Sequence, residues 1–274
     1  MAAKAADQLG GHVARLAPGT ELNATLVARH DWTGSLASFS VRPDGGVGLF
    51  EAGQYFALGL VIDGRLLQRP YSAATGPGPI GNLEFLVRRV EQGMFSPRLW
   101  ALEPGARLRI GRAKGLFTLR PNDPRSHLFV ATGSGLAPLV AMLDQLLARA
   151  ATADPEPGGR PRAVLVHGVG HPDELAYRRR LEALTANPAG AAYEPIVSRA
   201  TAPGPGGWVG RTGRVASHLD ELCRVHGLVP GNCVAYLCGN PAMITTVEQL
   251  LTARGFGRDA IVSEQYWPAD GGPG

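Results

Sequence analysis

Five short segments carry side chains that could bind a phosphorylated cofactor or take part in its chemistry. The first is Arg69-Pro70-Tyr71-Ser72, which ends a strand-like run. Alternation along a strand places Arg69 and Tyr71 on one face and Ser72 on the other. An arginine can hold a phosphate, an aromatic ring can stack on a flat cofactor, and a hydroxyl can bond to its edge. Alone, the tetrapeptide also fits a solvated arginine at the edge of a sheet.

Two glycine-containing segments precede predicted helices, where free backbone N–H groups and the helix dipole favour an anion. Residues 93–97 (GMFSP) lead into a helix that Ser96 can cap and that carries Pro97 in its first turn. Residues 131–138 (ATGSGLAP) join a buried-type strand to a helix, as dinucleotide phosphate sites do, although their glycine spacing is not GxGxxG. Alone, either segment also fits a helix cap or a tight turn without a ligand.

The last two segments lie near the carboxyl end of the chain. Cys238 ends the apolar run CVAYLC and is followed by GNP. Because ligands bind beyond the carboxyl ends of strands in an open parallel sheet, this thiol can face a substrate ring, although a cysteine also serves as a small buried hydrophobic side chain. Residues 263–267 (SEQYW) place a carboxylate beside two aromatic rings, which either cover a bound group or dock the chain end.

Two patterns of elements must position these segments. Short runs rich in β-branched and aromatic residues, separated by Gly, Pro and Asp, predict a closed antiparallel β-barrel. The runs span residues 20–30, 36–42, 54–62, 83–90 and 106–112. After the PNDP turn, strands alternate with amphipathic helices, which predicts a Rossmann-like parallel sheet with helices on both faces. We therefore expect an N-terminal arm at residues 1–19, a β-barrel domain at 20–122, an α/β domain at 123–267 and a tail at 268–274.

Composition argues against several classes of protein. The 274 residues carry a net charge of +4, almost all of it from arginine, which reflects either phosphate recognition or the base composition of the genome. The basic residues form no run, which argues against nucleic-acid binding. Three cysteines without a CxxC pair argue against a disulfide framework, a zinc site or an iron–sulfur cluster. With no signal segment and no apolar stretch of about 18 residues, the chain is predicted to be cytoplasmic, without a metal or a membrane span.

Read in order, the segments resemble the ferredoxin/flavodoxin–NADP⁺ reductase family, and its bacterial branch in particular. The order and approximate spacing of that family are matched over residues 20–267 by RPYS, LEFLVRRVEQGMFSPRL, FVATGSGLAP, YLCGNPAMI and SEQYW. The resemblance implies a barrel domain that binds FAD and an α/β domain that binds NADP(H). It also implies electron transfer between NADP(H) and ferredoxin or flavodoxin, by hydride transfer between nicotinamide C4 and flavin N5, in a monomer.

The resemblance assigns catalytic roles to Ser72, beside flavin N5, to Cys238, beside the nicotinamide, and to Glu264, a proton-relay or nicotinamide-positioning carboxylate. It assigns FAD contacts to RPYS, whose arginine would bind a phosphate and whose ring would stack on the flavin. Further FAD contacts come from a strand that acts largely through its backbone and from a pyrophosphate loop. The turn after the domain boundary and the final aromatic residues complete the set. These positions are Arg69, Pro70, Tyr71, Ser72, Leu86, Val87, Arg88, Met94, Phe95, Ser96, Ser134, Tyr266 and Trp267.

For NADP(H), the resemblance implies contacts from the glycine-rich turn, from the CGNP segment and from a pair of arginines at the 2′-phosphate. These positions are Thr132, Gly133, Gly239, Asn240, Pro241, Ser198, Arg199 and Arg214, with Arg211 as an alternative to Arg214. One departure concerns Gly170, where bacterial relatives commonly carry an arginine. It leaves the preference between NADPH and NADH open, with His171 and Arg211 able to compensate.

Two other functions stay open. The first is an NAD(P)H-dependent reductase component of an oxygenase system; many such proteins carry a fused iron–sulfur domain, for which this chain has no cysteine set. The second is a non-catalytic module that binds flavin or nucleotide. The joint presence of Ser72, Cys238 and Glu264 argues against that second function.

Overall fold

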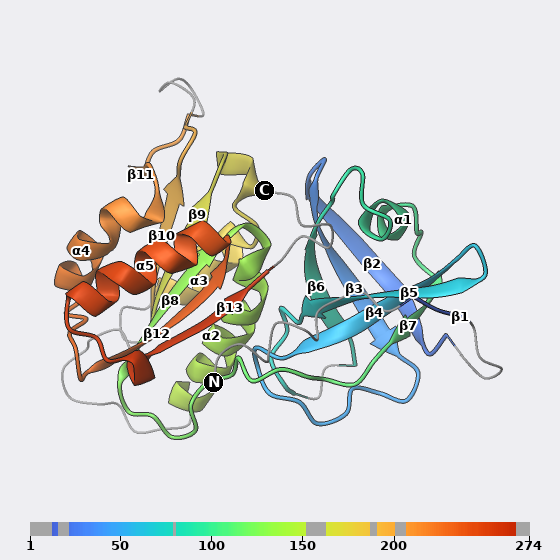
Figure 1. Cartoon of the computed structure of the whole chain (residues 1–274), viewed down its shortest axis with the longest axis horizontal. Helices are drawn as coiled ribbons and strands as arrows, with labels where there is room; N and C mark the ends of the chain where they lie inside the picture. Colours follow the sequence, from blue (N-terminus) through green and yellow to red (C-terminus); the bar gives the residue numbers. More distant parts are fainter. Residues whose placement is uncertain are drawn as a thin grey trace.

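The computed structural model describes residues 13–15, 22–78, 81–151, 163–186, 191–200 and 207–266. They form two sheets that lie side by side, an antiparallel one from the first half of the chain and a parallel one from the second (Figure 1). This confirms the predicted fold class, a β-barrel followed by a Rossmann-like α/β unit. None of the described helices is long and apolar enough to cross a membrane.

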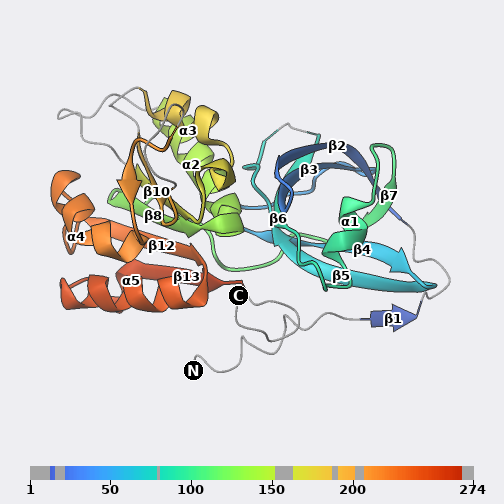
Figure 2. The ribbon, with the colours of Figure 1, turned by 90° about the horizontal axis from the view of Figure 1, so that it is seen from above.

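The antiparallel sheet has seven strands in the order β1-β5-β4-β7-β2-β3-β6 and curves round its own core (Figure 2). The strands are β1 (Val13–Arg15), β2 (Ala24–Thr33), β3 (Leu36–Pro43), β4 (Tyr55–Ile62), β5 (Arg65–Ser72), β6 (Leu83–Arg88) and β7 (Arg107–Ile110). Their inward side chains, among them Phe39, Leu58 and Phe85, are fully buried in that core. Within the expected N-terminal arm, the three residues of β1 pair with β5 as an edge strand.

The predicted helix after residues 93–97 is α1 (Ser96–Trp100), which is short and is not capped by Ser96. Its N-cap residue is Phe95, which makes no side-chain hydrogen bond. The Ser96 hydroxyl instead accepts the backbone N–H of Val90 at 2.8 Å. The serine therefore ties down the loop before the helix, and the helix ends after little more than one turn.

The parallel sheet has six strands in the order β11-β10-β9-β8-β12-β13. They are β8 (Ser126–Thr132), β9 (Ala163–Val169), β10 (Ala191–Val197), β11 (Arg211–Thr212), β12 (Cys233–Gly239) and β13 (Ile261–Gln265). The central strands β9 and β12 are buried along their whole length and are largely apolar, because helices cover both faces of the sheet (Figure 1). Sequence analysis missed β11, which has only two residues, and β13, which looked like a docking segment at the chain end.

In the described part of the chain, four α-helices cover the parallel sheet. Helices α2 (Leu136–Ala151) and α3 (Arg178–Thr185) pack on one face, and α4 (Val215–Val225) and α5 (Pro241–Ala253) pack on the other. Before α3, Pro172–Glu174 form a separate 3-10 turn.

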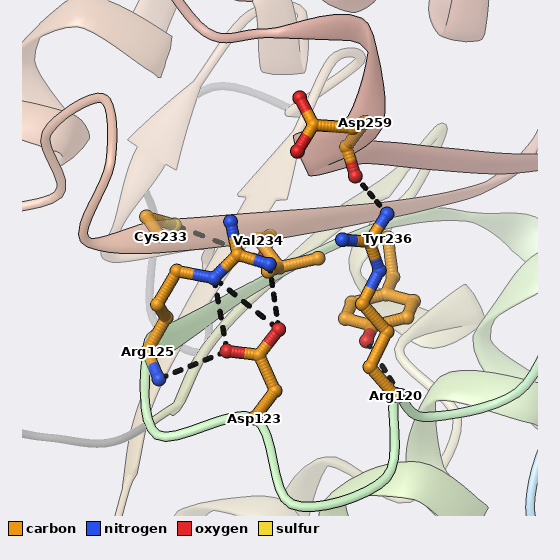
Figure 3. A network of polar contacts seen from close by, with 7 residues as sticks. All are labelled: Arg120, Asp123, Arg125, Cys233, Val234, Tyr236 and Asp259. Carbon is orange, nitrogen blue, oxygen red and sulfur yellow. Dashed lines mark hydrogen bonds and ion pairs between the residues drawn. The ribbon is translucent and has the colours of Figure 1, made fainter.

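The chain between the two sheets is anchored on the second domain (Figure 3). The backbone N–H of Arg120 donates to the Tyr236 hydroxyl at 3.1 Å, and the Arg120 guanidinium donates to the carbonyl of Asp259. Arg125 binds the carboxylate of Asp123 at 2.6 Å, which lowers the pKa of that carboxyl to about 2. These contacts fix the point at which the chain enters β8.

A mixed apolar and polar interface joins the two domains. The Trp32 ring of β2 packs edge-on against Tyr177, with ring centroids 5.1 Å apart. The Tyr177 hydroxyl donates to the carboxylate of Glu84 in β6. Leu36 and Leu86 of the barrel belong to the same buried cluster as the start of α2. The barrel is therefore held against the carboxyl edge of the parallel sheet.

Candidate active site at the seam of the two domains

The three predicted catalytic residues meet where the barrel touches the parallel sheet, a place that we call the seam. Ser72 ends β5, and its hydroxyl donates to Oε1 of Glu264 at 3.3 Å. Glu264 lies in β13, which pairs with β12 in the register Cys238↔Glu264. The strand order reverses between β8 and β12, and ligands of open parallel sheets bind at such a switch point. Residues far apart in the sequence are thus brought together at the expected edge.

The seam is largely shielded from water. Ser72 is 3% exposed and Cys238 is fully buried. Burial raises the pKa of Glu264 to about 7, against a smaller lowering by the Ser72 hydroxyl. Burial and the nearby Glu264 carboxyl raise the pKa of the Cys238 thiol. Glu264 can therefore exchange a proton near neutral pH, whereas Cys238 presents a neutral, polarizable side chain.

Tyr266 follows β13 and completes the cluster. Burial, together with Cys238 and Glu264, raises the pKa of its hydroxyl. That hydroxyl is buried close to the Ser72 hydroxyl and the Cys238 thiol, but no hydrogen bond of ordinary geometry pairs it among the described residues. An unpaired buried hydroxyl is costly, so it fits a site in which the polar edge of a ligand completes the hydrogen bond. Trp267, the other predicted aromatic residue, lies outside the residues that the structure describes.

The strand that ends at Ser72, β5, also carries an aromatic ring and an arginine. The Tyr71 ring lies against Phe95, with centroids 5.8 Å apart. The Arg69 guanidinium donates to the neighbouring Gln68 carbonyl and has no carboxylate partner in the described parts of the chain. The Ser96 hydroxyl, also a predicted FAD contact, is already bonded to the backbone of Val90, and the Met94 carbonyl accepts the Arg98 guanidinium. A ring and an arginine that has no counter-ion among the described residues fit a flavin dinucleotide.

The remaining predicted flavin residues lie in β5, β6 and the turn after β8. Leu86 is buried at the domain interface, and Val87 is buried in the barrel core. Pro70 pairs with Ala57 in the β4–β5 ladder. Ser134 lies in the 3-10 turn Gly133–Gly135. Of this group, Leu86 and Ser134 belong to elements that pack together across the interface.

The turns after β8 and β12 pack against each other. The Thr132 hydroxyl accepts the backbone N–H of Asn240 at 2.9 Å. A Cβ at Gly135 would overlap the backbone of Cys238, and a Cβ at Gly239, whose φ is +133°, would overlap Thr132. Glycine is needed at both places for this close approach, which sets the starts of α2 and of α5, at Pro241, side by side.

Ser198, Arg199 and Arg214 form what we call the coenzyme end of the site. They follow β10 and β11, which pair in parallel, and all three are exposed. The Ser198 hydroxyl donates to the carbonyl of Val169 at 3.1 Å. Neither Arg199 nor Arg214 has an ion-pair partner among the described residues, so both can receive a phosphate.

Arg211, the predicted alternative to Arg214, is already ion-paired. Its guanidinium binds Glu194 at 3.1 Å and Glu221 at 2.8 Å. Two carboxylates neutralise its charge, so Arg211 is less available to an anion than Arg199 and Arg214.

Known proteins match both halves of the chain. The Oxidoreductase FAD-binding domain matches residues 23–119, and the Oxidoreductase NAD-binding domain matches residues 129–249. The ferredoxin–NADP reductase B of Sorangium cellulosum is 38% identical over 228 residues, which cover 82% of this chain and 88% of that protein. This chain belongs to the ferredoxin–NADP reductase family.

Solved structures share the architecture of this ferredoxin–NADP reductase family member. A ferredoxin NADP⁺ reductase from Neisseria gonorrhoeae with bound FAD and NADP matches 89% of this chain and 98% of its own, with 25% identity and a TM-score of 0.75. A cytochrome P450 reductase from Amycolatopsis matches 90% of this chain and 70% of its own, with 26% identity and a TM-score of 0.76. One architecture thus occurs in reductases named for different acceptors.

The family motifs led to the seam but not to Glu174. Arg88 was expected to act largely through its backbone, yet its guanidinium binds Glu174 at 2.9 Å across the two domains. The Asp173-Glu174 pair reads in the sequence as acidic residues at an ordinary helix start. Nothing in the sequence indicates that the partner of Glu174 lies in the other domain.

Proposed function

We propose that this protein is an FAD-dependent oxidoreductase that transfers electrons between NADP(H) and ferredoxin or flavodoxin. One observation carries the proposal: Ser72 of the barrel hydrogen-bonds Glu264 of the parallel sheet, with Cys238 beside it on the adjacent strand. A hydroxyl, a thiol and an ionisable carboxyl brought from two domains to one point support catalysis rather than simple nucleotide binding.

The barrel residues would hold FAD. Arg69 would bind a phosphate, Tyr71 would stack on the ring system and the Tyr266 hydroxyl would find its missing partner there. When bound, FAD supplies a carrier that exchanges hydride with nicotinamide C4 at N5 and exchanges single electrons with a protein partner. Because Ser72 occupies Oε1 of Glu264, the second carboxyl oxygen, Oε2, is left to hold or release a proton near neutral pH.

The coenzyme end would select the nucleotide. Arg199 and Arg214 would bind the 2′-phosphate of NADP(H) in charge-assisted hydrogen bonds, supported by Ser198. The turn residues Thr132 and Gly133, with the turn Gly239–Pro241, would place backbone N–H groups along the rest of the coenzyme. Two arginines without a carboxylate partner in the described parts of the chain support NADPH over NADH, in spite of Gly170.

We further propose a monomer in the cytoplasm that meets a small acidic carrier. Ferredoxin is the acceptor in the name of the Sorangium relative, and the same one-electron chemistry suits flavodoxin. A net charge of +4 speeds the encounter with an acidic partner.

The purified protein provides the test. We expect it to be yellow, to lose its visible flavin absorbance when NADPH is added without oxygen, and to reduce at least one member of a panel of ferredoxins and flavodoxins. A colourless protein that binds no FAD would overturn the proposal. A yellow protein that NADPH does not bleach would support a non-catalytic flavin module instead.

A second candidate is the reductase component of an oxygenase system. The structural likeness to a cytochrome P450 reductase supports it, as does Gly170, which leaves NADH as a possible donor. This candidate predicts fast bleaching by NADH and transfer to an oxygenase-associated iron–sulfur protein. A NADPH/NADH ratio of kcat/KM well above one, with transfer to ferredoxin, would favour the first proposal.

A further inference from the structure

Glu174 connects the two domains beside the coenzyme end. It closes the 3-10 turn that follows β9. Its Oε1 binds the guanidinium of Arg88 in β6 at 2.9 Å, and the two side chains are only 17% and 38% exposed. Its Oε2 accepts the backbone N–H groups of Gly170 at 2.9 Å and of His171 at 3.1 Å. One carboxylate therefore holds the barrel with one oxygen and the turn after β9 with the other.

The same turn supports Arg199. The carbonyl of Gly170 accepts the backbone N–H of Arg199 at 2.8 Å. A Cβ on Gly170 would lie 2.8 Å from Oε2 of Glu174 and 3.2 Å from Nη2 of Arg199. The Arg199 guanidinium thus occupies the space that a side chain at Gly170 would need, and the peptide beneath it is held by Glu174.

We propose that Glu174 is a positioning residue for recognition of the 2′-phosphate of NADP(H). By fixing the Gly170 peptide, Glu174 fixes where Arg199 leaves β10 and where its guanidinium can lie. A long exposed side chain binds a phosphate well only when its supporting residues limit its rotamers. The inference rests on the proposed function, in which Arg199 binds that phosphate.

Arg88 removes the electrostatic cost of this arrangement. A bare carboxylate close to a phosphate site would repel the phosphate. The Arg88 guanidinium neutralises Glu174 from the other domain and also lies 3.8 Å from where a Cβ on Gly133 would stand. With Arg88 in place, Glu174 can hold the turn without opposing the bound anion.

Calorimetric titration of the FAD-loaded protein with 2′,5′-ADP and with 5′-ADP tests the inference. We expect the wild type to bind 2′,5′-ADP more tightly than 5′-ADP. Glu174→Ala should lose about tenfold in affinity for 2′,5′-ADP and nothing for 5′-ADP. Glu174→Gln should stay within about threefold of wild type, because its amide oxygen can still accept the two backbone N–H groups.

Variants of Arg88 test whether this arginine neutralises the Glu174 charge. Arg88→Ala leaves the Glu174 charge uncompensated and should weaken 2′,5′-ADP binding. The double variant Arg88→Ala/Glu174→Gln removes that charge and should regain most of the affinity. Steady-state assays should show a higher KM for NADPH in Glu174→Ala, with kcat and the KM for NADH unchanged. Glu182→Ala, which removes an exposed carboxylate paired with Arg178 in the same domain, is the matched control and should alter neither ligand.

The outcomes distinguish failure of the proposed NADP(H) site from failure of the role given to Glu174. A wild type that does not prefer 2′,5′-ADP would overturn the proposed NADP(H) site itself. A wild type that prefers it, with Glu174→Ala binding 2′,5′-ADP equally well, would overturn only the role of Glu174. Equal losses for 2′,5′-ADP and 5′-ADP, or equal losses in the alanine and glutamine variants, would also overturn that role.

Discussion

The seam and the coenzyme end lie at the same edge of the parallel sheet but are built in opposite ways. At the seam, Cys238 is fully buried and Glu264 has its pKa raised to about 7 by burial. At the coenzyme end, Arg199 and Arg214 are exposed and carry their charges into water. The first region tunes protonation by removing solvent, and the second offers fixed positive charge to an anion.

Because the two regions differ in burial, the seam is tested by varying pH and the coenzyme end by varying ionic strength. Groups tuned by burial respond to pH and to the removal of a proton, and salt affects them little because the site excludes ions. Exposed arginines respond to ionic strength, since screening acts over roughly 10 Å in dilute salt. Variants of the seam should therefore change kcat, whereas variants of the coenzyme end should change KM and its salt dependence.

Glu264→Gln removes the ionisable carboxyl of the seam and has the largest expected effect on kcat. Glutamine keeps the shape and an acceptor for Ser72 but cannot exchange a proton. We expect kcat for NADPH-dependent electron transfer to fall by about 100-fold or more, with FAD content unchanged, in steady-state assays. Glu182→Gln on α3 is the control and should keep full activity. A Glu264→Gln enzyme as fast as wild type would remove proton exchange from the account of the seam.

The raised pKa of Glu264 also predicts a pH-dependent stability. The folded protein keeps a proton that the unfolded chain releases from its ordinary pKa of 4.5 upward, so stability falls as pH rises from there to about 7. The loss is about 3 kcal/mol at most. The melting temperature of wild type relative to Glu264→Gln should therefore drop between about pH 5 and about pH 8. Parallel curves for the two proteins would show that burial does not tune this carboxyl.

Arg199→Ala removes one of the two exposed guanidinium groups of the coenzyme end. Loss of a charge-assisted hydrogen bond costs about 2 kcal/mol, so KM for NADPH should rise about 30-fold while KM for NADH stays unchanged. Added salt should shrink the difference between the two coenzymes. Arg211→Ala is the matched comparison: its guanidinium is already neutralised by Glu194 and Glu221, so its effect should be much smaller. Equal effects of the two substitutions would contradict the assignment.

Asn240→Ala has the smallest expected effect and tests the element between the two regions. The Asn240 side chain accepts the backbone N–H groups of Ala242 and Met243 and so caps α5. Its loss should lower the free energy of unfolding by about 1 kcal/mol, and Asn240→Asp should restore most of it. Thermal melts of the three proteins measure this. An unchanged melting temperature in Asn240→Ala would show that the cap does not stabilise the start of α5.

Local pattern was enough to predict most of the fold. Long apolar runs such as β12 and amphipathic runs such as α2 are visible in the sequence because burial dictates their composition. The two-residue strand β11 and the chain-end strand β13 were missed, because edge strands this short gain their structure from a neighbouring strand. Ser96 was misread as a helix cap, because its bond to Val90 depends on a loop conformation that no pattern encodes.

The site likewise contains residues that could be predicted from the sequence and residues that could not. RPYS and CGNP indicated the seam from the residues and from the family resemblance, and the Ser72–Glu264 contact agrees with that placement. The Arg88–Glu174 pair could not be predicted, because it depends on how the two domains dock. Contacts between domains are set by packing at the interface, here by Trp32 against Tyr177, and not by spacing along the chain.

The central claim is that the barrel and the parallel sheet supply one catalytic unit across the seam. A double-mutant cycle on Ser72→Ala and Glu264→Gln, followed by the single-turnover rate of flavin bleaching by NADPH, tests it most directly. If the two residues act as one unit, each single variant is slow and the double variant is no slower than the slower of the two. Rates that multiply, or two single variants as fast as wild type, would show that the two residues do not act together.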